Sequence, residues 1–295
     1  ASGSDVRVDI VHFTDAGCPW AYSAEPAFRA LEARYGDQLR WRTVMIGLAE
    51  TTEDYAARGY TGAGRALTKQ RFRVYGMPYS PHVLPRPMGT GMACRVAVAA
   101  ELQGQGMKEA VVRALRFGWH ASDELLLLDT AEGLERLLSR VDGFDATAAL
   151  AAISEPEVER RYQQDREESR SPVAHAVALN RCANTDGRDR YTAPSLVYKT
   201  DDGRESHLAG FLPFEAYETM LMNLEPRLTR LPVPELPDLL AHYPGGLTTM
   251  EVARVCAETT DLPDPVGVER ALVALCANGG ARRLRLGDDA LWVAD

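Results

Sequence analysis

Two strand patterns and one helix pattern open the chain. Residues Val6–Thr14 (VRVDIVHFT) alternate between apolar and polar side chains and are rich in β-branched residues, which indicates a strand. A helical pattern runs from Trp20 to Tyr35 and stops at Gly36, a residue type that often ends helices. Leu39–Leu48 predicts a second strand. This order favours two parallel strands joined by a crossover helix.

A mostly helical block follows, from Glu50 to about Arg190. Helices are predicted in this block at residues 55–75, 90–103, 107–119, 130–140 and 155–179. Two short strands, 195–199 and 206–209, are joined by the turn Asp201-Asp202-Gly203, and a helix from 213 to about 223 comes next. We therefore predict an α/β domain over residues 1–228, in which a helical insertion of about residues 50–190 interrupts one sheet.

The last part of the chain has a different character. Prolines are concentrated between residues 226 and 265, and Leu231–Pro234 predicts an extended linker. Thr248 and Glu251 form the pattern of a capping box at a helix start. A helix to about residue 258, a helix at 266–276 and strands at 282–286 and 290–293 follow in an order that resembles a winged helix. Residues 229–295 are thus predicted to form a linker and a small winged-helix-like domain.

Composition and charge exclude several classes of protein. Of the 295 residues, 45% are hydrophobic and 25% charged, which are the values of a folded globular chain. The net charge of -9 argues against a chain devoted to binding nucleic acid or anionic membranes. The segment from residue 246 onward carries more acidic than basic side chains, so we expect it to contact protein or to be structural rather than to bind DNA.

Cysteine usage and the absence of long apolar runs indicate a cytoplasmic protein with reduced thiols. No apolar stretch approaches the ~20 residues that cross a bilayer. Ala1–Ile10 lacks the apolar centre of a signal peptide, although a processed one could have been removed. The five cysteines are widely spaced, with no C-x-x-C pair and no zinc-ligand spacing, so no metal site is expected.

The segment Cys18-Pro19-Trp20 marks the junction of the first strand and the first helix. A cysteine at a helix N-terminus faces unpaired amides and the positive end of the helix dipole, both of which favour the thiolate. Pro19 suits the first helical position, where a missing N–H costs nothing. We therefore expect the pKa of Cys18 to lie below that of a free cysteine. The alternative is a small hydrophobic residue in a turn.

The stretch Phe13–Tyr22 (FTDAGCPWAY) resembles the active-site segment of the DsbA family of the thioredoxin superfamily, near its FrnE-like branch. In that family a cysteine caps the first helix, a proline kinks this helix, and a cis-proline opens a later strand beside the thiol. Cys18, Pro26 and Pro194 match these positions. The resemblance covers about residues 5–225 and implies a thioredoxin-like fold. It also implies catalytic and substrate-binding roles for Cys18, Pro19, Trp20, Ala193 and Pro194.

One departure from the family pattern limits the chemistry. Ala21 takes the place of the second cysteine of C-x-x-C, so an intramolecular partner is missing unless Cys94 or Cys182 approaches Cys18. The resemblance thus implies a DsbA/FrnE-like thiol–disulfide oxidoreductase with a single active-site cysteine, which works through mixed disulfides. The alternatives are a kappa-class-like glutathione transferase or isomerase, and a non-catalytic redox sensor.

The expected partners follow from this chemistry. We predict no tightly bound cofactor, a low-molecular-weight thiol such as glutathione or an analogue as co-substrate, and a protein or small molecule as the thiol or disulfide substrate. No membrane partner is expected, and a homo-oligomer is compatible with the sequence.

Several polar residues are candidates for tuning Cys18. Asp15 is expected to shape the turn, and its charge would oppose thiolate formation. His12 lies in the first strand, where a core role competes with a tuning role. Glu25 in the first helix is a candidate proton-transfer group, and His120 could line the cleft. A basic group in the insertion either forms a solvated face or holds the carboxylates of a peptide-like thiol; it comprises Arg65, Arg71, Arg73 and Arg86.

Overall fold

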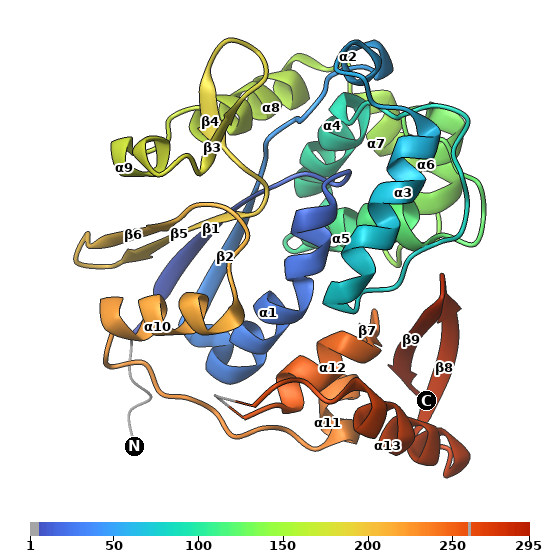
Figure 1. The fold of residues 1–295 in the computed structure, drawn as a ribbon, viewed down its shortest axis with the longest axis vertical. Helices are drawn as coiled ribbons and strands as arrows, with labels where there is room; N and C mark the ends of the chain where they lie inside the picture. Colours follow the sequence, from blue (N-terminus) through green and yellow to red (C-terminus); the bar gives the residue numbers. More distant parts are fainter. Residues whose placement is uncertain (1–5, 259–260) are drawn as a thin grey trace.

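A four-stranded sheet with strand order β2-β1-β5-β6 forms the centre of the computed structural model, which describes residues 6–258 and 261–295 (Figure 1). Strand β1 (Val8–Thr14) is parallel to β2 (Leu39–Met45). Strand β5 (Ser195–Thr200) is antiparallel to β1, and β6 (Glu205–Leu208) is antiparallel to β5. The predicted parallel pair and the later hairpin therefore form one thioredoxin-like sheet. The start of the predicted first domain, residues 1–5, lies outside the described residues.

Helices α1 (Pro19–Tyr35) and α10 (Phe214–Leu224) cover one face of this sheet. The alternation of β1 explains the arrangement, because successive side chains of a strand point to opposite faces. Val8 and Ile10 pack in the same buried cluster as residues of α1 and α10. Val11 and Phe13 belong to a different cluster, on the face covered by Ala176 and Tyr191. The alternating side chains of β1 thus contribute to two buried clusters, one on each face of the sheet.

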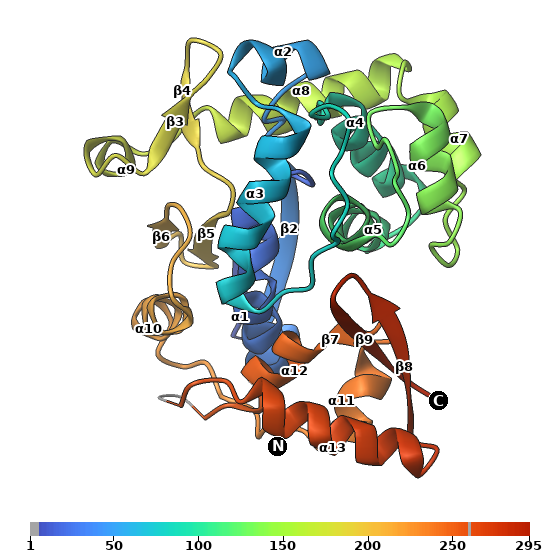
Figure 2. The same cartoon turned by 45° about the vertical axis from the view of Figure 1, so that its right-hand side comes forward.

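The insertion between β2 and β5 consists of eight helices, two short 3₁₀ turns that follow α3 and α4, and a two-stranded hairpin, while a third 3₁₀ turn, η1, joins α1 to β2. The elements are η1 (Gly36–Gln38), α2 (Thr52–Ala57), α3 (Gly62–Phe72), η2 (Arg73–Tyr75), α4 (Gly91–Ala100), η3 (Glu101–Gln103), α5 (Met107–Ala121), α6 (Ala131–Leu138), α7 (Ala146–Ala152), α8 (Pro156–Ser169), α9 (Ala174–Ala178), β3 (Cys182–Asn184) and β4 (Asp189–Tyr191). Figures 1 and 2 show α4, α5, α6 and α7 gathered on one side of α1.

Two predicted helices are each divided in two. The predicted helix 55–75 is broken between α2 and α3, where Gly59 adopts a φ of +82° that ends a helix. The predicted helix 155–179 is broken between α8 and α9 at Pro172, which cannot continue the hydrogen-bond ladder. Helix α7 and the hairpin β3–β4 are additions to the predicted elements.

The C-terminal segment contains three helices and a three-stranded sheet with strand order β7-β9-β8. In chain order the elements are α11 (Leu236–His242), β7 (Leu247–Thr248), α12 (Thr249–Cys256), α13 (Pro265–Ala277), β8 (Ala281–Leu286) and β9 (Asp289–Ala294). Apart from α11 and β7, the elements follow the predicted order, and the winged-helix-like character of this segment stays a prediction. The predicted capping box is present, because Thr248 and Glu251 each bond the other's backbone amide. Helix α11 and strand β7 were not predicted.

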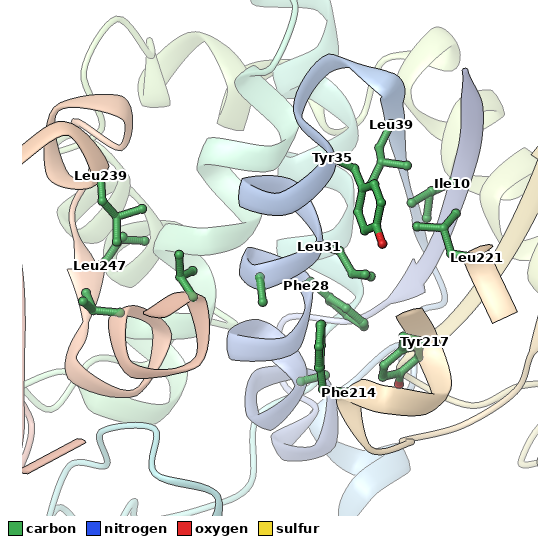
Figure 3. Packing of buried hydrophobic residues seen from close by; sticks show 14 of the residues in the cluster. Ile10, Phe28, Leu31, Tyr35, Leu39, Phe214, Tyr217, Leu221, Leu239 and Leu247 are labelled. Carbon is green, nitrogen blue, oxygen red and sulfur yellow. The ribbon is translucent and has the colours of Figure 1, made fainter. Parts of the chain in front are cut away.

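The C-terminal segment shares the core of the sheet domain. Leu239 and Leu247 belong to the same buried cluster as Ile10, Phe28 and Leu31. Figure 3 shows α1 lying between these two groups of side chains, with the C-terminal leucines on one side and the sheet residues on the other. The boundary near residue 228 therefore separates two stretches of sequence that are packed on the same helix.

Within residues 6–258 and 261–295, no helix is both long enough and apolar enough to cross a bilayer.

Candidate active site

Cys18 stands at the N-cap of α1, directly before Pro19 at the first helical position. Its Sγ donates a hydrogen bond to the carbonyl oxygen of Ala193 at 3.2 Å, although the two residues are 175 positions apart in the sequence. The Ala193–Pro194 peptide bond is cis, and Pro26 lies inside α1. The fold thus brings together the cysteine and the proline-containing strand start that the sequence analysis singled out.

The pKa of Cys18 is raised, contrary to the expected lowering. Burial is the main cause, because the residue is only 6% exposed and a thiolate there would be poorly solvated. The backbone amides of Ala21 and Trp20 lower the pKa, as expected at a helix N-terminus, and Arg65 adds to their effect. Burial and the negative charge of Asp15 outweigh them. The thiol form also fits the hydrogen bond that Sγ donates to Ala193.

Asp15 holds the turn that carries Cys18. Its side chain is fully buried and accepts hydrogen bonds from the amides of Gly17 and Leu48, both at 2.9 Å. It also accepts hydrogen bonds from Thr90 Oγ1 at 2.9 Å and from Cys94 Sγ at 3.5 Å. The carboxylate therefore shapes the turn and joins it to helix α4.

Gly17 is the residue that lets this turn approach α4. A Cβ atom at this position would lie 2.9 Å from Thr90 Cγ2 and 3.2 Å from the ring of Trp119. Both neighbours are buried, so a larger side chain would displace the turn and with it Cys18.

His12 and Glu25 lie away from the thiol, on the lining of a cavity of about 220 Å³ between the sheet, α1 and α5. His12 packs against the ring of Phe28, with centroids 4.9 Å apart, and burial together with Arg116 places its pKa well below the usual value. Glu25 pairs with Arg116, and with Arg113 at 3.4 Å. Neither His12 nor Glu25 is among the main causes of the raised pKa of Cys18, and the packing of His12 on Phe28 supports a core role for His12.

His120 is also a core residue. Its ring stacks on Tyr22 with centroids 4.8 Å apart, and it is 3% exposed. Burial, followed by the charges of Arg65 and Lys69, places the pKa of His120 well below the usual value. His120 therefore packs against α1, and it does not line the groove beside Cys18.

A groove of about 260 Å³ opens beside the contact between Cys18 and Ala193. Trp20 forms one wall and packs on Phe72 and Phe211, with ring centroids 4.6 and 5.3 Å apart. Pro19 and Pro194 do not line this groove, whereas Trp20 and Ala193 do. The lining residues are Trp20, Asn180, Arg181, Thr192, Ala193, Gly210 and Phe211.

Two residues of the groove, Asn180 and Arg181, were missed by the sequence analysis. They lie between α9 and β3, where no motif or period marks them. The only local signal is Asn180 itself, because asparagine tolerates the positive φ of 55° that it adopts there.

The other cysteines do not form disulfides within the described residues, where all five thiols are free. Cys94 is fully buried and directs its Sγ to Asp15. Cys182 packs at the edge of the buried cluster that contains Cys18. Burial raises the pKa of both Cys94 and Cys182. Resolution of Cys18 by either thiol stays a prediction.

The predicted basic group is divided between two places. Arg65 donates to the carbonyl oxygen of Gly17 at 2.9 Å, and Arg71 lies over the ring of Trp20 at 5.6 Å from its centroid. Arg73 instead pairs with Asp288 at 2.8 Å, and Arg86 pairs with Asp129. Only the first two arginines therefore lie beside the Cys18 turn.

The fold and the site define a class of protein: a thioredoxin-like sheet whose first helix begins at a cysteine that contacts the start of a later strand. The family model described as the DSBA-like thioredoxin domain matches residues 9–172. The chain belongs to this family, which confirms the resemblance found in the sequence. A search of curated proteins found no match.

Solved structures show the same fold at low sequence identity. One is described as a probable DsbA oxidoreductase from Streptomyces coelicolor; it is 19% identical, with a TM-score of 0.53, and the match covers 78% of this chain and 95% of that chain. Another is the cytosolic disulfide reductase DsbM from Pseudomonas aeruginosa with GSH; it is 15% identical, with a TM-score of 0.50, and the match covers 73% of this chain and 100% of that chain.

Proposed function

We propose that the chain is a DsbA/FrnE-like thiol–disulfide oxidoreductase that works with Cys18 as its single active-site cysteine. The observation that carries this proposal is the 3.2 Å contact between Cys18 Sγ and the Ala193 carbonyl oxygen, beside the groove walled by Trp20. Membership of the DSBA-like family supports it.

The reaction can be written with every atom accounted for. Cys18 loses its proton to solvent, and the thiolate attacks one sulfur of a disulfide RS–SR. A mixed disulfide Cys18–S–S–R forms, and the other half leaves as a thiolate that takes up a proton. A second thiolate R′S⁻ then attacks the R sulfur, which releases R–S–S–R′ and restores Cys18. The substrate disulfide is exchanged, and the protein gains and loses no electrons over the cycle.

The position of Ala21 explains why an external thiol must complete this cycle. It occupies the place of the second cysteine of the family motif and is fully buried, so no thiol stands one turn into α1. We therefore propose a low-molecular-weight thiol as the co-substrate, with no tightly bound cofactor. The description of the DsbM structure, which contains GSH, supports a thiol of this kind, and its cytosolic label fits a reducing compartment for this chain.

Mass spectrometry of the intact protein tests the proposal. After exposure to oxidised glutathione, we expect one glutathione adduct on Cys18, which is removed by added thiol with release of a disulfide. Cys18→Ser should lose both the adduct and any turnover in a coupled disulfide reduction assay, whereas Cys182→Ser should retain them. An adduct that forms only on other cysteines, or full turnover in Cys18→Ser, would contradict the proposal.

The missing second cysteine favours one second candidate, a redox sensor that is modified once and does not turn over. With Ala21 in the place of a resolving cysteine, an adduct on Cys18 persists until an external thiol removes it. The coupled assay separates the two functions, because a sensor gives a stoichiometric adduct without continued substrate reduction. Among the residues that the structure describes, no contact specifically favours a kappa-class-like transferase. Thiol conjugation measured on the same preparation tests that alternative.

A further inference from the structure

The positive charges of the chain are distributed unevenly. Most lysines and arginines pair with a carboxylate, as expected for a chain with a net charge of -9. Within residues 6–258 and 261–295, Arg7 and Arg270 have no carboxylate within 4.0 Å, and the remaining exceptions gather around the Cys18 turn. These mouth cations are Arg58, Arg65, Lys69, Arg71, Arg181 and Arg190.

Contacts on the α3 side place three of the mouth cations. Arg65 donates to the Gly17 carbonyl oxygen, one residue before the thiol, and its charge acts on Cys18. Lys69 lies one helical turn further along α3, where burial and Arg65 lower its pKa to about 8, so most molecules still carry this charge at pH 7. Arg71 lies over the ring of Trp20, the wall of the groove.

Arg181 and Arg190 are two further mouth cations. Arg181 lines the groove and is exposed. Arg190 is only 4% exposed; it donates to the Tyr191 carbonyl oxygen at 3.1 Å and to Thr185 Oγ1 at 3.4 Å, while its Nε is buried without a hydrogen-bond partner among the described residues. Its charge also acts on Cys18 and Asp15. A buried guanidinium without a paired carboxylate costs free energy, which a positive site for an incoming anion would explain.

The negative charge near the thiol is already bound. Asp15 is fully buried and accepts four hydrogen bonds from Gly17, Leu48, Thr90 and Cys94. No carboxylate lines the groove itself. A ligand in the groove therefore meets Arg181 and the neighbouring Arg71 with no carboxylate among the lining residues, while Asp15 stays hydrogen-bonded inside the turn.

We infer that this groove selects anionic, carboxylate-bearing small disulfides and thiols, with Arg181 and Arg71 facing the carboxylates and Trp20 contacting the stem. This inference rests on the proposed function, because the anion is the substrate of Cys18. Guanidinium groups bind carboxylates in paired, planar geometry, and the aromatic wall suits an apolar linker between the sulfur and the charge.

Three small disulfides that differ mainly in charge provide the test. They are 3,3′-dithiodipropionate, which is anionic, bis(2-hydroxyethyl) disulfide, which is neutral, and cystamine, which is cationic. The rate of Cys18 adduct formation is measured by mass spectrometry and divided by the rate of each disulfide with a free cysteine derivative. We expect the anion to react about 10-fold faster than the neutral disulfide at low salt, and the cation to react slowest. High salt should reduce the preference.

Matched variants assign the preference to the groove. Arg181→Gln and Arg71→Gln should each reduce the ratio of anionic to neutral rates, whereas Arg270→Gln, at an exposed unpaired arginine of α13, should leave it unchanged. Equal normalised rates for the three disulfides, or an unchanged ratio in both groove variants, would overturn this inference and leave the proposed function standing. Failure of all three disulfides to modify Cys18 would overturn the proposed function as well.

Discussion

At the scale of single residues, Cys18 is subject to opposing effects. Two amides at the start of α1 and the charge of Arg65 stabilise a thiolate, while burial and Asp15 destabilise it. Loss of the Asp15 carboxylate would destabilise the turn, because it accepts hydrogen bonds from the Gly17 amide and from the Thr90 hydroxyl. The turn that positions the sulfur therefore also keeps it protonated.

The pH dependence of alkylation follows from the raised pKa. With the neutral reagent iodoacetamide, we expect the rate at Cys18 to rise with pH and to reach its midpoint above the ~8.5 of a free thiol. The same residue in denatured protein should titrate near the ordinary value and serves as the control. The folded state binds this proton more tightly, so its contribution to stability is present below pH ~8.5 and is lost as pH rises through the folded pKa. A midpoint below 8.5 in the folded protein would show that burial does not dominate.

At the scale of elements, the strong periodic segments were predicted and the short ones were not. The alternation of Val6–Thr14 and the helical run to Tyr35 were sufficient to predict β1 and α1. Strands of two or three residues such as β3, β4 and β7 contain too few positions to show a period. The motif around Cys18 located the site, but its pKa depends on burial by distant segments, such as Ala193, which local sequence does not reveal.

The start of α12 allows a test of an element that both sequence and structure define. Thr248 is fully buried and its Oγ1 accepts from the Glu251 amide at 3.2 Å. We expect Thr248→Ala to lower the free energy of unfolding by about 1–2 kcal/mol, because it leaves a buried amide without its cap. Thr61→Ala removes an equivalent cap at the exposed start of α3 and should cost less. Denaturant unfolding measures both, and equal losses would show that burial of the cap is unimportant.

At the scale of the whole molecule, the C-terminal segment is joined to the sheet domain by charge as well as by apolar packing. Arg113 of α5 donates to both carboxylate oxygens of Glu251, at 2.7 and 2.8 Å, and to the carbonyl oxygen of Gly246. Glu251 has no exposed surface. Burial alone would raise the pKa of Glu251, but Arg113 and Arg29 outweigh it and lower the pKa to about 2.

Replacement of the Glu251 carboxylate should weaken the contact between the C-terminal segment and the sheet domain. We expect Glu251→Gln to lower the free energy of unfolding at pH 7 by about 3 kcal/mol, because it removes the two short ion-pair contacts of Arg113 at a buried interface and leaves only the longer one to Glu25. A lowered folded pKa contributes stability above the unfolded value near 4.3, which is lost as pH falls toward 2. The difference between wild type and variant should therefore shrink between pH ~5 and ~2. Glu258→Gln, at an exposed position, is the control, and a similar loss there would argue against the buried pair.

The loop between β8 and β9 contacts the insertion of the sheet domain through Asp288. Asp288 accepts from the Tyr79 amide at 2.7 Å and donates its own amide to the Tyr79 carbonyl oxygen at 3.1 Å, and Arg73 pairs with its carboxylate. The tip of the loop is therefore held against the segment that joins η2 to α4, so binding of a DNA duplex by this loop would first require these hydrogen bonds and the Arg73 ion pair to break.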